Sequence, residues 1–188
     1  DHIPNMVKLI AADKVRPILE VLPRDNIDVN RISLTNVQDL CTALEIQYNA
    51  NKPKRPKDAL IEELKKSINE TIAEFVQDKP EIDIHKSTNI ASAFKYLDFT
   101  LVDKILTLYG ECESIINQFI EQKSLSAIDE SRIRAFVKLR NDKTHSGEIN
   151  WGNNGETYVI LLALLYACIL KNTGVDSSII HQLLVALF

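Results

Sequence analysis

An uninterrupted apolar run from Tyr158 to Leu170 places the strongest constraint on how this chain folds. A helix formed by these residues is hydrophobic on every side, and it is stable in water only when other elements surround it. The run is shorter than the roughly 18 to 20 apolar residues that cross a bilayer. We therefore expect residues 157–172 to form a buried core helix, and we expect no membrane span.

Other segments carry apolar residues at the i, i+3, i+4 spacing of an amphipathic helix. They cover residues 35–48, 57–78, 90–122, 129–141 and a last stretch that ends near Leu187. Thr35 and Gln38 predict a capping box at the start of the first segment. Residues 90–122 form either one long helix or two helices with a break near 98–100, where Thr100 and Asp103 resemble a second box. These patterns predict an all-α bundle.

Residues 51–57, which read N-K-P-K-R-P-K, are the best candidate for a domain boundary. Prolines and charge of one sign are typical of a solvated linker, although an arm that contacts phosphates has the same composition. We expect residues 57–188 to form the main bundle. Residues 1–56 are then an N-terminal helical extension or the end of a preceding domain, made of short pieces interrupted by Pro4, Pro17 and Pro23.

The remaining segments carry few signals. Residues 25–33 form either a loop or one short strand, and residues 79–89 are expected to form a loop with His85 on the surface. Glu111 and Glu113 lie on a predicted helix near its apolar stripe. Both are expected to face solvent, because charged side chains are usually solvated.

Composition excludes several classes of function. A net charge of −4 argues against a sequence-independent nucleic-acid binder that relies on many phosphate contacts, but it leaves room for a local basic site. Three widely separated cysteines indicate core residues in a reducing, cytoplasmic protein. No Cys or His pair has metal-ligand spacing, so no metal or cofactor is expected. Because the chain begins with Asp1, we expect it to be a fragment or a processed product.

Arg140 is the first candidate for chemistry. Ile133, Phe136, Val137 and Arg140 fall at i, i+3, i+4 and i+7, so the arginine continues an apolar stripe. A guanidinium in that position must be paired, lie at a rim, or line an interface or cleft. The other basic residues of this helix are predicted to point elsewhere as ordinary surface charge: Arg132, Arg134 and Lys138.

His145 follows the end of the Arg140 helix, just before Gly147. Residues 146–156 contain three glycines and the turn dipeptide Asn154-Gly155, which predicts a loop. Trp151 lies in this loop. It either anchors the loop to the core, which is the commoner role, or stacks on a nucleobase.

The segment R-N-D-K-T-H from Arg140 to His145 resembles the motif of HEPN-family ribonucleases: Arg, a polar residue, and His after four to six positions. The surrounding order also resembles the HEPN domains of ApeA-type anti-phage abortive-infection proteins. These have a long helix, a short helix that carries the motif, an apolar helix and a Gly-capped turn such as N-T-G-V-D. The resemblance extends over residues 57–188, and only the motif is specific.

The resemblance implies a HEPN-like bundle and a metal-independent endoribonuclease, in which a ribose 2′-hydroxyl attacks the adjacent phosphate. His145 is then the acid or base, because its side chain titrates near pH 6.5. Arg140 stabilises the charge that develops on phosphate oxygens. Asn141 orients one of these groups. The predicted RNA contacts are Lys143, Lys138, Arg134 and Trp151.

One motif supplies one histidine, whereas cleavage benefits from a base and an acid. A homodimer that pairs two Arg140 helices about a two-fold axis supplies both. The expected partners are therefore an RNA, with tRNA as one candidate, a second copy of the chain, and a sensor domain in a longer protein of bacterial defence or toxin type. Two alternatives stay open: a non-catalytic dimerisation or interaction module, and an Arg140 and His145 that merely brace a helix end.

Overall fold

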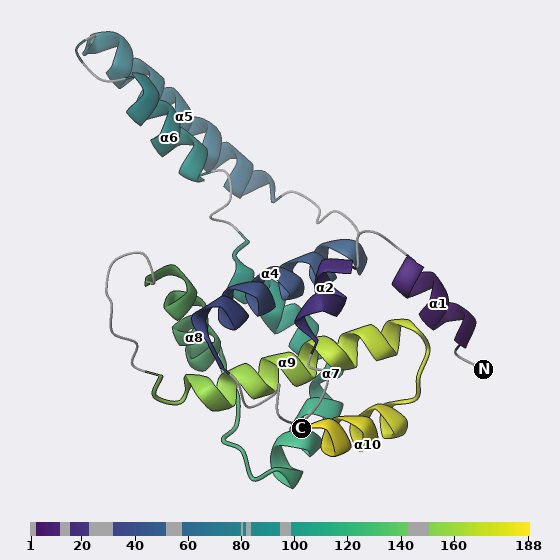
Figure 1. Cartoon of the computed structure of the whole chain (residues 1–188). Coiled ribbons are helices and arrows are strands. Elements are labelled where there is room, and N and C mark those ends of the chain that lie inside the picture. The colour runs from purple at the N-terminus through teal and green to yellow at the C-terminus, as the bar shows by residue number, and fades with distance from the viewer. Residues whose placement is uncertain are drawn as a thin grey trace. The chain divides into compact units, whose positions relative to one another are not determined.

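The computed structural model describes residues 3–11, 16–22, 32–51, 58–79, 81, 84–94, 99–142 and 151–188. Every regular element in these ranges is an α-helix, which confirms the expected all-α class (Figure 1). In chain order the helices are α1 (Ile3–Ala11), α2 (Arg16–Val21), α4 (Leu34–Asn51), α5 (Ala59–Asp78), α6 (Ile84–Phe94), α7 (Leu101–Gln122), α8 (Glu130–Asp142), α9 (Asn154–Asn172) and α10 (Ser177–Leu187).

The helices belong to two compact units. Asp1–Asn51 and Leu101–Phe188 together form the first, here called the core unit, and Lys52–Thr100 forms the second, the hairpin unit of α5 and α6. This division differs from the boundary expected at residue 56. The reason is that α4 packs against α7, α8 and α9, so it belongs to the main bundle although a separate unit interrupts the chain after it.

Helix α9 lies at the centre of the core unit, as predicted from its apolar run. It packs against α4, α7, α8 and α10. Its buried residues occupy all sides of the helix, from Thr157 and Tyr158 through Leu161 to Ile169. By length and composition α9 is able to cross a membrane, but 61% of its apolar window is buried inside the structure. This is consistent with the core helix of a soluble protein.

Hydrogen bonds define where the core helices begin and end. The predicted cap at Thr35 is wrong by two residues: the Asn36 amide donates to Ser33 Oγ at 3.2 Å and the Ser33 amide donates to Asn36 Oδ1 at 3.1 Å. This is a reciprocal capping box. At the end of α9, Gly174 has a φ of 84°, and the Val175 amide donates to the Leu170 carbonyl at 3.2 Å. That is the Schellman ending of α9.

The hairpin unit corrects one further expectation and decides another. Helix α6 begins at Ile84, so part of the predicted loop 79–89 is helical, and His85 lies exposed on α6. Of the two alternatives for residues 90–122, the one with a break is confirmed, because α6 ends at Phe94 and α7 begins at Leu101. The predictions for residues 25–31 and for the basic segment 52–57 lie outside the described residues.

The three cysteines are buried and free, as expected. Cys112 on α7 and Cys168 on α9 lie with their Sγ atoms 3.7 Å apart. The hydrogen bond with Cys168 lowers the pKa of the Cys112 thiol, and the positive charge of Lys171 acts in the same direction. These thiols are part of the contact between the two longest core helices.

Candidate functional site

Arg140 lies in the last turn of α8, on the stripe that the sequence predicted. Ile133 and Phe136 are buried, whereas Val137 and Arg140 are half-buried. Phe136 packs near Tyr158 of α9, with ring centroids 6.5 Å apart. The stripe therefore leaves the core as it approaches the end of α8, and Arg140 occupies the rim.

The positive charge of Arg140 acts on Cys41 of α4. Burial raises the pKa of the Cys41 thiol to about 12, and the positive charge of Arg140 opposes this rise. Within the described residues Arg140 forms no hydrogen bond or ion pair. A half-buried cation at a rim is suited to bind an anionic group.

The other residues of the predicted catalytic group are only partly described. Asn141 follows Arg140 in α8 and is exposed. Lys143 and His145 lie outside the described residues. The approach of His145 to Arg140 therefore stays a prediction, and the composite Arg–His site rests on the sequence motif.

The predicted RNA contacts do not gather around Arg140. Arg134 and Lys138 are exposed on α8, and the Arg134 Nε donates to Glu130 Oε1 one turn earlier at 2.7 Å. Trp151 is half-buried and packs against the core. Its carbonyl accepts a hydrogen bond from the Asn154 amide at 2.7 Å. This geometry favours the anchoring role of Trp151 over base stacking.

Arg132 was expected to be ordinary surface charge, and that expectation is wrong. Its Nη1 donates to the carbonyls of Ser126 and Ala127 at 2.7 and 2.8 Å, and its Nη2 lies 3.3 Å from Glu156 Oε2. A further donation reaches the Asn153 carbonyl at 3.4 Å. One side chain thus ties the start of α8 to the preceding loop and to the first turn of α9. Only its tertiary neighbours reveal this, because no local pattern marks it.

Two carboxyls around Arg132 are held in the charged form. Hydrogen bonds from Ser126 lower the pKa of the Glu156 carboxyl, and Arg132 adds to the effect. The Ser131 hydroxyl and the Arg132 amide lower the pKa of the Asp129 carboxyl, which caps α8. Both shifts belong to helix starts and ion pairing, so they indicate a structural cluster and not an acid–base pair.

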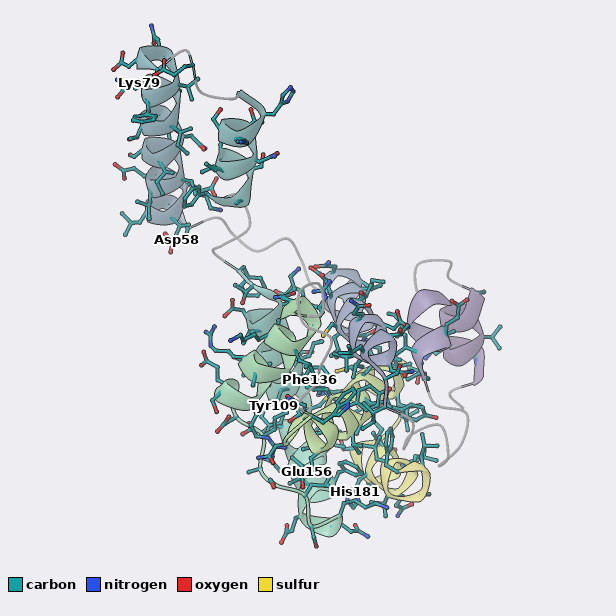
Figure 2. All side chains as sticks on the ribbon, turned by 60° about the vertical axis from the view of Figure 1, so that its left-hand side comes forward. Asp58, Lys79, Tyr109, Phe136, Glu156 and His181 are labelled. Atoms are coloured by element: carbon teal, nitrogen blue, oxygen red, sulfur yellow. The ribbon has the colours of Figure 1, made fainter. Side chains whose placement is uncertain are left out.

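A pocket of about 360 Å³ adjoins this cluster. It is lined by Ser131, Arg132, Ala135, Gly152, Asn153, Asn154 and Thr157. Ser131 and Ala135 lie on the side of α8 opposite to the stripe that ends at Arg140, so the pocket is separate from the Arg140 site. Figure 2 shows Phe136 and Glu156 on α8 and α9, in the part of the core unit from which both sites are built.

In the described part of the chain, no group of three or more His, Cys, Asp or Glu side chains is placed to hold a metal ion. Glu111 and Glu113 are exposed on α7, as expected. Comparison with family models, with curated proteins and with solved structures finds no match to this chain.

Proposed function

We propose that the chain is a metal-independent endoribonuclease of HEPN type, acting as the effector domain of a bacterial anti-phage or toxin system. The observation that carries the proposal is Arg140, a half-buried cation at the rim of an apolar stripe with no anionic partner among the described residues. The motif from Arg140 to His145 adds a group that titrates near neutral pH. The fold is compatible, because both units are helical.

In the proposed reaction the ribose 2′-hydroxyl attacks the neighbouring phosphorus, and the 5′-oxygen leaves. The products are a 2′,3′-cyclic phosphate and a 5′-hydroxyl, so no water is consumed in this step. His145 removes the 2′-proton or protonates the leaving oxygen. Arg140 donates to the non-bridging oxygens, on which negative charge grows, and its planar fork suits two oxygens at once.

A second copy of the chain completes the site in this proposal. A two-fold axis beside α8 brings two Arg140 and two His145 to one cleft, so one histidine serves as base and the other as acid. The half-buried rim around Val137 and Arg140 supports this choice, because pairing α8 with its copy covers apolar surface that the core leaves partly open.

The test is cleavage of a mixed RNA pool in the presence of EDTA. Arg140→Ala and His145→Ala are expected to lower the rate about 10²- to 10³-fold, the usual effect of removing one stabilising donor. Arg140→Lys keeps the charge but loses the fork, so it is expected to restore only part of the activity. Mass spectrometry of the products should show a terminal cyclic phosphate.

Lys8→Ala is the matched control, because Lys8 is an exposed cation on α1 and is not among the predicted RNA contacts. It should cleave at close to the unmodified rate. Equal activity in all variants would refute the site, and loss of activity in EDTA would refute the metal-free reaction. A dimer that forms normally but cleaves no RNA would favour the non-catalytic interaction module instead.

A further inference from the structure

Helix α5 is amphipathic and yet none of its residues is buried. Ile61, Ile68, Ile72 and Val76 are half-buried on the side toward α6. A second set of large apolar side chains stands in solvent within the hairpin unit: Leu60 is 75% exposed, Leu64 55% and Phe75 57%. Side chains stand out along the whole length of α5 between Asp58 and Lys79 in Figure 2.

The exposed apolar residues share one face. Leu60, Leu64 and Phe75 are separated by four and eleven residues, which are whole turns of a helix, so they form a stripe along α5. The stripe lies beside the α6-facing side and not on it. We call it the outer stripe. Exposed apolar stripes of this length mark interaction surfaces in soluble proteins.

Acidic residues border the outer stripe on the edge opposite to Ile61, Ile68 and Ile72. Glu63, Glu70 and Glu74 fall there by helical spacing, and all three are exposed. Lys66 approaches Glu70 at 3.6 Å, but it lies farther round the helix, with 76% of its side chain exposed. A partner that covers the outer stripe therefore meets three carboxylates along one edge, of which Glu70 is already paired with Lys66.

This border argues against a second copy of α5 as the occupant. In an antiparallel two-fold pair each edge faces its own copy, so carboxylate would meet carboxylate. In a parallel pair the acidic edge faces the other side of the partner stripe, where α6 of that copy stands. The antiparallel pair therefore opposes like charges, and among the described cations on the facing side the parallel pair offers only Lys86 of α6 and Lys65, which is already paired with Glu62.

The groove between α5 and α6 is a weaker candidate. Its volume is about 1010 Å³, and its charged lining residues are Glu62, Lys65, Lys66 and Glu70. Lys65 and Glu62 already pair at 3.4 Å. Because its positive and negative charges balance, the groove favours neither an anionic nor a cationic ligand, in contrast to the acidic edge of the outer stripe.

We infer that the outer stripe of α5 binds an amphipathic helix of a partner protein whose apolar residues are bordered by Lys or Arg. The apolar contacts supply most of the affinity, and the row of carboxylates selects the basic partner and its orientation. The inference does not depend on nuclease activity, because it concerns the hairpin unit alone.

The test uses the full chain and two synthetic helical peptides. Both carry leucine at i, i+4, i+11 and i+15, and they differ only in lysine or glutamate along one edge. Fluorescence anisotropy at low salt should show about ten-fold tighter binding of the lysine peptide, as three exposed ion pairs provide. The preference should fall toward unity at about 1 M salt, where the Debye length is about 3 Å.

Substitutions in the outer stripe and in its acidic edge test where the peptides bind. Leu60→Ser, Leu64→Ser and Phe75→Ser combined should abolish binding of both peptides while leaving the thermal midpoint within about 2 °C. Glu63→Lys with Glu74→Lys should reverse the preference to the glutamate peptide. Glu113→Lys with Glu121→Lys, at exposed positions on α7, makes the same change in net charge and should leave the preference intact.

Several results would overturn the inference. Equal binding of the two peptides would remove the role of the carboxylates. A large fall in the thermal midpoint of the triple serine variant would mean that the chain itself covers the stripe. If the unmodified chain is a dimer and the triple serine variant is a monomer, a second copy of the chain is the occupant. If the unmodified chain binds zwitterionic vesicles and the triple serine variant does not, the occupant is a membrane.

Discussion

The core unit and the hairpin unit both contain long amphipathic helices, but these helices differ in how many of their residues are buried. The amphipathic helix α7 buries Ile105, Ile116 and Phe119 completely, whereas α5 buries no residue although it is only two residues shorter. The difference lies in the number of neighbours. Helix α7 packs against α4, α8, α9 and α10, while the main packing partner of α5 in the described part of the chain is α6. Amphipathic pattern alone therefore predicts a helix but not its burial.

Replacing one phenylalanine in each unit should give the largest difference in the free energy of unfolding between the two units. Phe136 is fully buried, so Phe136→Ala is expected to lower the free energy of unfolding by about 3–5 kcal/mol. Phe75 is 57% exposed, and Phe75→Ala should change it by about 0.5 kcal/mol or less. Urea titration followed by circular dichroism compares the two. Similar losses would mean that the outer stripe is covered in solution.

Two arginines of α8 sharpen the comparison within the core unit. Arg132→Ala leaves the carbonyls of Ser126 and Ala127 without their donor, and it should cost about 1–3 kcal/mol. Arg134→Ala breaks only an exposed pair with Glu130 and should cost about 0.5 kcal/mol or less. Urea unfolding monitored at Trp151 measures both. Equal costs would show that Arg132 is not the tie between α8 and α9.

Acid should remove a smaller contribution from Glu156. Its folded pKa is below the ordinary value of 4.5, so the stabilisation is present above pH 4.5 and is lost as the pH falls through the lowered value. The side chain is 41% exposed, so solvent screening limits the effect to about 0.5 kcal/mol or less. Glu156→Gln should be less stable than the unmodified chain at neutral pH, and the gap should close in acid. A constant gap would contradict this linkage.

The smallest effect is expected when the hairpin unit is removed. The described residues between 58 and 100 contribute nothing to the buried cluster of the core unit. Replacing residues 52–100 with a short Gly/Ser linker should leave the unfolding transition at Trp151 within about 0.5 kcal/mol. A loss several times larger would show that the two units stabilise each other.

Local signals predicted the parts of this fold that depend on local physics. The apolar run identified α9. The stripe through Ile133 and Phe136 predicted that Arg140 is paired, lies at a rim or lines an interface or cleft, and the structure has it at a rim. Helix periodicity is a property of neighbouring residues, so the sequence is sufficient to recognise it.

Tertiary relations escaped the same reading. The role of Arg132 depends on Glu156, which is 24 positions away. It also depends on backbone carbonyls, which every residue has and which therefore leave no signal in the sequence. The capping box at Ser33 was missed because Asn36 takes the place of the usual Glu or Gln. The division of the chain was missed because composition marks a boundary at residues 51–57 but does not show that α4 packs with helices beyond the next unit.

The interrupted core unit also has a consequence for the order of folding. Helix α4 meets α7 only after the chain between Asn51 and Leu101 has closed a loop, and the entropy cost of closure rises with the length of that loop. Helices α5 and α6 pack against each other, so their early pairing from local contacts shortens the effective loop. The hairpin unit thus influences how fast the core assembles while leaving its final stability almost unchanged.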